Sequence, residues 1–446
     1  MKPIYRPTRK RYGTSVLCLV ALLFVVSCRK ADVPVPQQQS SVSQFSASIA
    51  TGWMEQFRHA VTTEHITPPL ASRIYAYAGI AVYEAVLPGM PQDRSLAGQV
   101  PLLQAIPTPA STSNLQYEIT VNEAMYGVAK ALFANAGAAT LSSIDSFYNA
   151  HKSAIAANPA DIQASQEFGK SVATAVANRA ASDGFAETRS MTYQVPGRNL
   201  NPANWAPTGP ALQPLEPFWG KIKCFAMTSS NECEQAMTCT FDSTAGSNFY
   251  NQAKEVYDVS QNLTQEQRDI ALWWADGAGT ATPPGHWLAI ANQLANSKGL
   301  DLGRAAEMYA LLNLGLADAF ISCWDAKYKC NLLRPVTYIR DYIQGGSNWS
   351  SLIATPPFPE YPSGHSVASG AAAEILTAIF GNISFTDNTN KSMGLTPRSF
   401  SSFYAAADEA AISRLYGGIH YRQSIENGVI EGKKVGQSVF AHIKLR

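Results

Sequence analysis

Residues 356–380 read PPFPEYPSGHSVASGAAAEILTAIF, a proline-stiffened loop that leads into an alanine-rich run. Small and apolar residues recur there at three- and four-residue spacing, which predicts a helix ending near Phe380. Ser363 can cap this helix, and Gly364 lets the backbone approach a ligand closely. The first helical turn exposes free N–H groups with partial positive charge, so it can hold an oxyanion, and His365 could exchange a proton beside it. Taken alone, the block is equally well explained by a Ser-capped helix with a satisfied histidine.

The same helical spacing dominates the chain from about residue 46 onward. Alternating, strand-like runs are few, so the fold class that we predict is all-α, a helical bundle. Residues 186–245 differ because they are rich in Pro, Asn, Thr and Ser. We interpret them as a long structured excursion, which can include short strands, rather than as a linker between domains. The expected helices lie near residues 46–61, 69–87, 115–134, 138–156, 162–182, 263–275, 286–297, 301–326, 363–380, 399–416 and 422–443.

The composition of the 446 residues excludes several classes of protein. Apolar residues make up 46% of the chain, which is too many for a mostly disordered protein and leaves room for a large buried core. The chain has 34 Lys and Arg against 33 Asp and Glu. A charge this close to neutral argues against nucleic-acid binding, which needs a basic surface. We therefore expect one large folded domain over residues 46–446.

The N-terminal residues have the pattern of an export signal. Five basic residues precede an apolar run from Val16 to Val26, which is too short to span a bilayer comfortably. The run ends in Val-Val-Ser-Cys28, which resembles a bacterial lipobox; a plain signal peptide with an incidental cysteine is the alternative. We expect residues 1–27 to be removed, Cys28 to carry lipid and residues 28–45 to form a disordered tether. The protein would then be exported and lipid-anchored at the periplasmic or outer-surface face of a bacterial membrane.

Five cysteines follow Cys28 in the sequence. An exported protein meets oxidising conditions, so pairing among Cys224, Cys233 and Cys239 is open, although an odd total leaves at least one thiol free. Cys323 and Cys330 would lie about 10 Å apart along a helix, which is too far for a disulfide. The sequence has no Cys-x-x-Cys pair, which argues against a structural zinc site.

Two further blocks carry strong cations. In Lys327-Tyr-Lys-Cys-Asn-Leu-Leu-Arg334-Pro335, the two outer cations are about two helical turns apart, so they could share one helix face. Pro335 would end the turn and place Arg334 at a helix terminus. In Arg414-Leu-Tyr-Gly-Gly-Ile-His420, the glycine pair would break the helix and redirect His420 toward the same site. Taken singly, such blocks are more often a solvated surface and a helix end with a core histidine.

Together, the three blocks supply three cations, a Ser-Gly helix N-terminus and two histidines, which suit a tetrahedral or bipyramidal oxyanion such as phosphate or vanadate. Their order and spacing, Kx6RP, then PSGH, then SRx5H, resemble the signature of the vanadium-dependent haloperoxidase and type 2 phosphatidic acid phosphatase superfamily. The likeness covers roughly residues 50–446 and is thin across 186–245. Further segments resemble the chloroperoxidase branch: Trp324, Pro356–His365, Trp273–Gly277, Pro283–Trp287 and Arg73–Tyr77.

This resemblance implies a role for each matching residue. His420 would bond to the vanadium of vanadate, and His365 would act as acid and base. Trp324 and Phe358 would line the halide side of the pocket. Asp276 would pair with Arg414 from outside the pocket. The oxyanion would be held by Lys327, Arg334, Ser363, Gly364 and Arg414.

One position departs from the family pattern. The phosphatase pattern often has Asp four residues after the second histidine, where it can orient the imidazole, and this chain has Ser424. A hydroxyl adds no charge, so we expect His420 to be a weaker ligand and nucleophile. His286 is a further pocket candidate upstream, which we expect to be a structural histidine instead.

Three functions remain open at this point, each with its catalytic or binding motifs in residues 320–425. The leading hypothesis is a vanadate-dependent haloperoxidase, in which Lys327 polarises hydrogen peroxide and a halide is oxidised to hypohalous acid. The alternative is an acid phosphatase that hydrolyses a soluble phosphate ester, in which case no cofactor is needed and His420 becomes the phosphorylated group. The third is a lipid-anchored protein that binds an oxyanion without turnover. Oligomerisation is compatible with all three.

Overall fold

A computed structural model describes residues 41–109, 115–154, 157–209, 212–277 and 279–446. The expected signal peptide, Cys28 and the first part of the expected tether lie outside the described residues. Residues 41–45 were expected to belong to that tether, and the structure corrects this boundary. They include the short 3-10 helix η1 (Ser41–Gln44), the Val42 side chain is buried, and the Phe45 carbonyl accepts a hydrogen bond from the Leu302 N–H at 2.9 Å.

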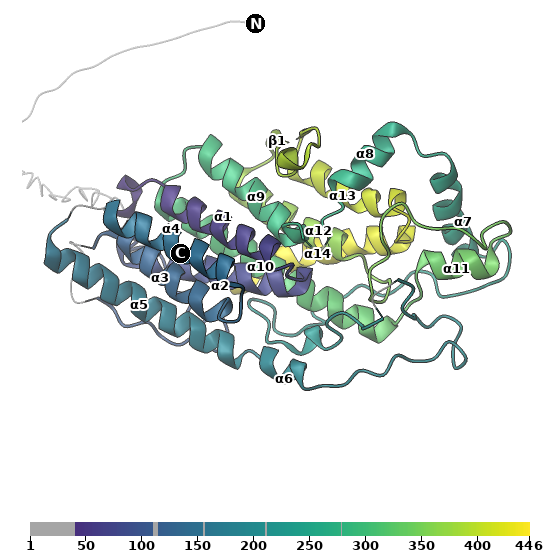
Figure 1. The fold of residues 1–446 in the computed structure, drawn as a ribbon, viewed down its shortest axis with the longest axis horizontal. Coiled ribbons are helices and arrows are strands. Elements are labelled where there is room, and N and C mark those ends of the chain that lie inside the picture. Colours follow the sequence, from purple (N-terminus) through teal and green to yellow (C-terminus); the bar gives the residue numbers. More distant parts are fainter. Residues whose placement is uncertain (1–40, 110–114, 155–156, 210–211, 278) are drawn as a thin grey trace, which may run out of the picture. The chain divides into compact units, whose positions relative to one another are not determined.

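Helices account for almost all regular structure in the described residues, as the sequence predicts (Figure 1). The first half of the chain contains α1 (Ser48–Thr63), α2 (Pro68–Val86), α3 (Tyr117–Leu132), α4 (Ala138–Ala154), α5 (Pro159–Ser182) and α6 (Phe185–Arg189). The second half contains α7 (Asn248–Gln261), α8 (Gln265–Trp273), α9 (Thr282–Ser297), α10 (Leu302–Cys330), α11 (Pro335–Tyr342), α12 (Gly364–Phe380), α13 (Phe403–Tyr416) and α14 (Arg422–His442). Three further 3-10 helices are η2 (Leu87–Gly89), η3 (Trp219–Lys221) and η4 (Lys391–Met393). A small antiparallel sheet pairs β1 (Phe385–Asp387) with β2 (Arg398–Phe400), with Thr386 opposite Ser399.

Each expected helix has a counterpart, and three helices were missed. In α7 the buried residues Phe249, Ala253 and Val256 have helical spacing but lie in a mostly polar segment, and the start of the helix is set by the Ser247 cap. The helices α6 and α11 are short and follow directly on other elements. None of the helices in the described part of the chain combines the length and apolarity that a membrane span needs.

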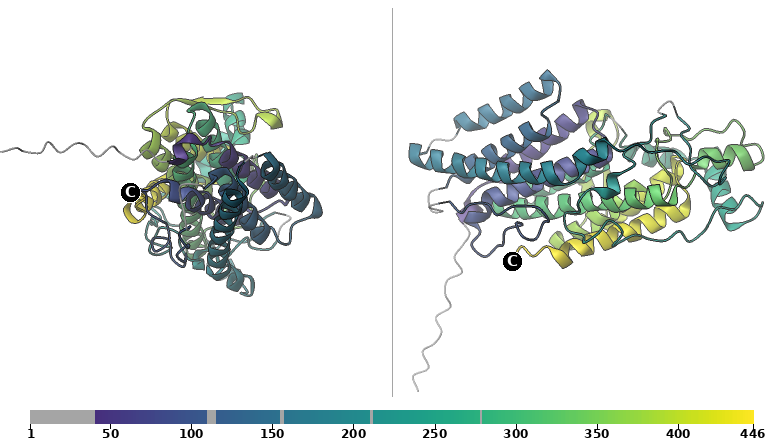
Figure 2. Two further views of the ribbon diagram at one scale, coloured as in Figure 1. Left: turned by 90° about the vertical axis from the view of Figure 1, so that its left-hand side faces the viewer. Right: turned by 90° about the horizontal axis from the view of Figure 1, so that it is seen from below.

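Helix α10 forms the centre of the bundle and is buried along most of its length. It packs against α2 and α12, and α12 packs in turn against α13 and α14. The N-terminal helices α1–α5 gather at one end of the bundle, and α7 and α11 lie at the other end (Figure 1), which the second view in Figure 2 also shows. The starts of α12 and α14 and the end of α10 meet in one region, because the Ser363 N–H donates to the Ser424 carbonyl and the Lys327 ammonium donates to the Pro362 carbonyl.

Glycines let α12 and α14 approach closely. A Cβ atom at Gly432 would lie 2.1 Å from the Val367 carbonyl oxygen, and one at Gly370 would lie 2.5 Å from the Val429 carbonyl oxygen. Because backbone occupies both positions, the two helices could not keep their separation with larger residues there.

The excursion at 186–245 is structured, but its described residues contain no strand beyond one isolated bridge between Asn204 and Leu332. The expectation of short strands was therefore wrong. Hydrogen bonds to side chains hold the segment in place instead. The buried carboxylate of Asp318 on α10 accepts hydrogen bonds from the N–H groups of Phe225, Ala226 and Met227, each at 2.7 Å.

The five cysteines of the described residues are free thiols: Cys224, Cys233, Cys239, Cys323 and Cys330. The pairing that the sequence left open among the first three is therefore absent from this structure. Burial raises the pKa of Cys323 to about 12, so its thiol is kept in the unreactive protonated form.

Adding one methyl group at the α12–α14 crossing tests this packing. Gly432→Ala should lower the free energy of unfolding by about 1–3 kcal/mol, because the new Cβ displaces the backbone of α12. Lys434→Ala, at an exposed position of the same helix, is the matched control and should change stability by less than about 0.5 kcal/mol. Denaturant unfolding of both variants checks this; equal stability would contradict the close contact.

Candidate active site

Two of the three predicted cations come from different helices. Helix α10 ends at Cys330, and Asn331 follows with a φ of 47°, so Lys327 lies in the last turn of α10. Arg334 is the N-cap residue of α11. The expectation that both cations share one helix face was therefore wrong, because the helix breaks before Pro335. Both side chains are nevertheless fully buried and point to the same region.

Backbone carbonyls of the proline-rich loop hold these cations. The Lys327 ammonium donates to the carbonyls of Pro359 at 3.1 Å and Glu360 at 3.0 Å, and also to that of Pro362. Arg334 donates from Nε to the Phe358 carbonyl at 2.9 Å. The loop at 356–362 therefore carries the two cations as well as the start of α12.

The start of α12 lies where the sequence predicts it. Ser363 caps the helix by accepting a hydrogen bond from the Ser366 N–H at 3.3 Å, and Gly364 begins the first turn. The first-turn N–H groups of a helix have no acceptor within the helix, so they are available to an anion. A Cβ atom at Gly364 would lie 3.2 Å from the Trp324 ring, so glycine lets this ring come close to the helix terminus.

The glycine pair redirects His420 as expected. Helix α13 ends at Tyr416, Gly418 has a φ of 78°, and the Ile419 N–H donates to the Arg414 carbonyl at 3.1 Å. His420 then lies just before α14, where its Nε2 atom is 3.2 Å from Nη1 of Arg334. His420 therefore contacts Arg334 directly, and the charge of Arg414 also acts on its imidazole.

A buried carboxylate that the sequence analysis did not assign orients His420. Glu360 accepts hydrogen bonds from Nδ1 of His420 at 2.8 Å, from the Tyr421 N–H at 2.8 Å and from the Ser424 hydroxyl at 2.6 Å. Ser424 therefore positions Glu360 rather than the imidazole. Glu360 therefore takes the orienting place that the sequence analysis considered for Ser424, and burial raises the pKa of its carboxyl to about 7. The signal was in the sequence, because Glu360 is the one acid in the segment 356–365.

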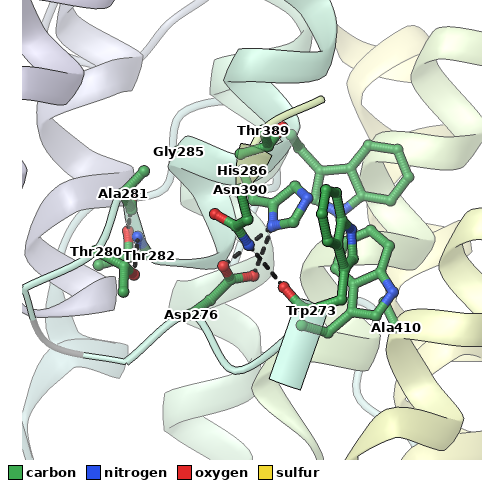
Figure 3. A network of polar contacts seen from close by, with 12 residues as sticks. Trp273, Asp276, Thr280, Ala281, Thr282, Gly285, His286, Thr389, Asn390 and Ala410 are labelled. Carbon is green, nitrogen blue, oxygen red and sulfur yellow. Dashed lines mark hydrogen bonds and ion pairs between the residues drawn. The ribbon is translucent and has the colours of Figure 1, made fainter. Parts of the chain in front are cut away.

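A second buried network surrounds His286, and Figure 3 shows its contact with Asp276. Asp276 and Asp387 flank His286, with Nδ1 of His286 2.9 Å from Asp276 and Nε2 2.8 Å from Asp387. The His286 ring also stacks on Trp274, with ring centroids 4.3 Å apart. The two carboxylates raise the pKa of His286 to about 10 against the opposing effect of burial. His286 is thus a protonated, buried link between two acids, in line with the structural role expected for it.

The expected pairing of Asp276 with Arg414 is electrostatic and without direct contact among the described residues. Asp276 contacts His286 and lies 4.0 Å from Nε2 of His365. Arg414 instead donates to the Trp274 carbonyl, and the charge of Asp276 acts on it without a direct ion pair among the described residues. Asp276 therefore influences both Arg414 and His365 from behind the pocket.

Some of these groups line a cavity of about 590 Å³, whose lining does not include Lys327, Arg334 or Ser363. Arg414, His365, His420 and Gly364 meet there with the rings of Trp324 and Phe358, whose centroids are 4.9 Å apart. Three buried nitrogen atoms near this cavity have no hydrogen-bond partner: Nη2 of Arg334, Nε of Arg414 and Nε2 of His365. The two arginine nitrogens are donors, and an unpaired buried donor is costly, so the site is built for an additional acceptor.

Burial and mutual repulsion set the protonation of the site. Desolvation, followed by the charges of Arg334, Lys327 and Arg414, lowers the pKa of His420 well below its ordinary value. Desolvation, Arg414 and His286 do the same to His365. Burial also lowers the pKa of Lys327. Both histidines are therefore neutral near pH 7, and an anion in the cavity would relieve the three cations. The donor set fits vanadate or phosphate.

The comparisons with known proteins agree with this site. Residues 307–445 match a family model described as the second helical-bundle domain of vanadium chloroperoxidase. Vanadium chloroperoxidase of Curvularia inaequalis is 31% identical over 129 residues, and the match covers 24% of this chain and about a fifth of that protein's length. The match to this relative therefore extends over only part of either protein.

Two solved structures extend the likeness over the chain. The first bacterial vanadium-dependent iodoperoxidase is 36% identical, with a TM-score of 0.84, over 90% of this chain and 97% of that one. A bacterial vanadium-dependent chloroperoxidase in its holo form shares the fold, with a TM-score of 0.65 at 18% identity, over 85% of this chain and 93% of that one. Fold and site thus define an all-helical enzyme class with a buried oxyanion pocket. The chain belongs to the vanadium-dependent haloperoxidase family.

The carboxylate behind His420 can be tested by binding. Glu360→Gln should weaken orthovanadate binding by roughly 10–100-fold, because the amide no longer holds Nδ1 of His420 with a charged acceptor. Glu426→Gln, which removes an exposed carboxylate from the start of α14, is the control. Equilibrium dialysis with elemental analysis of vanadium measures both. Wild-type affinity in Glu360→Gln would rule out this orienting role.

The buried His286 should make stability depend on pH. Its pKa is raised from 6.5 to about 10, so the stabilisation from its charged form is complete below pH 6.5 and is lost as pH rises through 10. His286→Asn should be destabilised by about 3–5 kcal/mol at the acid end of this window, because two carboxylates lose their partner. The difference in the free energy of unfolding between this variant and wild type should become smaller toward pH 10.

Denaturant unfolding across this pH window measures this difference. His59→Asn, at an exposed position of α1, is the control and should show no such trend. A difference that does not change with pH would mean that His286 is not charged in the folded protein.

Proposed function

We propose that this protein is a vanadate-dependent haloperoxidase that oxidises a halide with hydrogen peroxide to hypohalous acid. The observation that carries the proposal is the pair of unpartnered buried donors, Nη2 of Arg334 and Nε of Arg414. Arg334 also contacts Nε2 of His420 at 3.2 Å, and Arg414 lines one cavity with His420 and His365. The similarity to an iodoperoxidase makes iodide the first halide to test.

The residues of the site divide the work of holding vanadate. Lys327, Arg334 and Arg414 would balance its charge, and the first-turn N–H groups of α12 with the Ser363 hydroxyl would bind its oxygens. His420 would ligate through Nε2, because Nδ1 is engaged by Glu360. When bound, vanadate in its highest oxidation state supplies a Lewis-acid centre that activates hydrogen peroxide toward halide.

Different groups of the site would handle the protons and the halide. Neutral His365 can take a proton at Nε2 from incoming hydrogen peroxide, and the charge of Asp276 at 4.0 Å would stabilise the imidazolium that forms. The Lys327 ammonium lies 5.6 Å from the Trp324 ring centroid and 5.1 Å from that of Phe358. A soft, weakly hydrated halide would suit this aromatic wall with a cation beside it.

An acid phosphatase activity is the second candidate, because one observation favours it. The Nδ1 hydrogen bond to Glu360 leaves Nε2 of His420 as the basic atom, which is what attack on a phosphoryl group requires. Phosphate would occupy the same cations, and His365 would protonate the leaving alcohol. The third hypothesis, oxyanion binding without turnover, rested on Ser424, and Glu360 now provides the hydrogen-bond acceptor for Nδ1 of His420.

We also propose that the protein is exported and lipid-anchored through Cys28. The support is the basic, apolar and Val-Val-Ser-Cys pattern of residues 1–28. Expression in a bacterial host with wild-type sequence should place the protein in the membrane fraction with a lipid-modified Cys28 by mass spectrometry. Cys28→Ala should release it from that fraction; unchanged membrane association would contradict the anchor.

One assay set distinguishes the enzymatic hypotheses. Purified protein incubated with orthovanadate, hydrogen peroxide and iodide should produce triiodide, and His420→Ala should reduce the rate by at least about 100-fold. His442→Ala, which removes an exposed histidine at the end of α14, should keep wild-type activity. Hydrolysis of p-nitrophenyl phosphate that vanadate inhibits, without any halide oxidation, would replace the haloperoxidase proposal by the phosphatase. Orthovanadate binding without either activity would support the third hypothesis.

A further inference from the structure

The start of α10, at the opposite end of this helix from Lys327, is a meeting point of segments that are far apart in the sequence. A Cβ atom at Gly303 would lie 2.5 Å from Cγ1 of Val42 and 3.0 Å from the Met90 sulfur. The N–H of residue 94 donates to the carbonyl of residue 445 at 2.6 Å. Four segments therefore form what we call the basic end: residues 42–46, 90–102, 298–307 and 443–446.

Positive charge is in excess at the basic end. Its four segments hold five basic and three acidic residues. In the chain beyond residue 27 acids outnumber bases, because five of the 34 Lys and Arg lie before it. Two of the three acids, Asp93 and Glu307, contact Arg446 at 3.4 and 2.7 Å, and Asp301 caps α10. Four exposed cations of this end have no ion pair among the described residues: Arg94, Lys298, Arg304 and Lys444.

The chain that follows the proposed lipid anchor joins the bundle at the same end. The sequence has 12 residues between Cys28 and Ser41, which even fully extended would span at most about 45 Å. Val42 is then buried against the start of α10. A lipid on Cys28 would therefore keep the four cations close to the bilayer that holds the lipid, which raises the effective concentration of that surface at this end.

Resting on the lipid anchor proposed above, we propose that the basic end docks on a bilayer that carries anionic phosphate headgroups. The negative surface potential of such lipids attracts Lys and Arg side chains within about a Debye length, roughly 8–10 Å. Leu102, which is 48% exposed, adds an apolar side chain to the same end. An anchored protein with this contact would have one preferred orientation on the membrane.

That orientation would keep the oxyanion site away from the lipid. Arg304 lies in the first turn of α10 and Lys327 in its last turn, so about 35 Å of helix separates them. Helices α7 and α11 lie at the end of the bundle opposite the N-terminal helices (Figure 1). Docking through the basic end would therefore hold the site on the aqueous side, where water-soluble hydrogen peroxide and halide reach it.

Lysine acetylation on vesicles tests the proposal with the full-length lipidated protein purified from bacterial membranes. The protein is reconstituted on vesicles of phosphatidylcholine alone, or of phosphatidylcholine with phosphatidylglycerol, and acetylated sites are quantified by mass spectrometry. Lys298 and Lys444 should react at least about threefold more slowly on the anionic vesicles, and high salt should restore their rate. Lys254 and Lys329, whose side chains are 46% and 50% exposed, are internal controls and should react equally on both.

A pair of variants tests whether the charge of the basic end causes the protection. Arg94→Gln combined with Arg304→Gln leaves both reporter lysines in place. It should bring their acetylation on anionic vesicles close to the rate on neutral ones. Arg268→Gln combined with Arg340→Gln removes two exposed cations outside the basic end and should behave like wild type. Circular dichroism should show the same helical content in both double variants.

The outcomes separate the docking surface from the anchor, because flotation with neutral vesicles reports on the anchor alone. Flotation with both kinds of vesicle, without slower acetylation of Lys298 and Lys444 on the anionic ones, would overturn the docking surface and keep the anchor. Flotation with anionic vesicles only, with protection that salt reverses, would keep the docking surface and overturn the anchor. Flotation with neither would overturn both.

Two further results would also count against lipid docking. Protection of Lys298 and Lys444 in the absence of vesicles would mean that a second copy of the chain covers the basic end. Protection that survives Arg94→Gln with Arg304→Gln would mean that the charge of this end does not hold it on the lipid.

Discussion

The burial of three cations around one cavity is the constraint on which the site depends. Lys327, Arg334 and Arg414 are each almost completely removed from solvent, and desolvation opposes their charged forms. Their charge is offset from behind by Glu360 and by the Asp276–His286–Asp387 group, in which the charged histidine cancels one of the two acids. Positive charge remains in excess at the cavity, so a bound anion completes the balance.

The arrangement of the helices in the bundle makes the burial of these three cations possible. Helix α10 passes through the centre and delivers Lys327 in its last turn, while the glycines at the α12–α14 crossing bring the starts of two other helices together. The Ser363 N–H donates to the Ser424 carbonyl at 3.0 Å, which joins the beginnings of α12 and α14 directly. Backbone carbonyls of the proline-rich loop then hold the cations, so the loop is as much a part of the site as the charged side chains.

Much of the site was predictable because its residues lie in short blocks with distinct chemistry. The Ser363 cap, the first turn of α12 and the break after Arg414 all depend on local preferences, and the structure has them where the sequence places them. The shared helix face of Lys327 and Arg334 failed because Asn331 takes a left-handed conformation, which periodicity does not report. The roles of Glu360 and Asp387 were missed because each acts on a histidine 60 or 101 residues away.

The sequence by itself determined the all-helical class, the three cation and histidine blocks and their family resemblance, because these depend on spacing over a few residues. Only the tertiary structure decided which acid faces which base, that Ser424 serves Glu360, and that four separate segments place their cations around the start of α10. Those pairings depend on how helices cross and loops return over large sequence separations. Side-chain type and local spacing carry no information about such contacts, since burial and close packing alone select them.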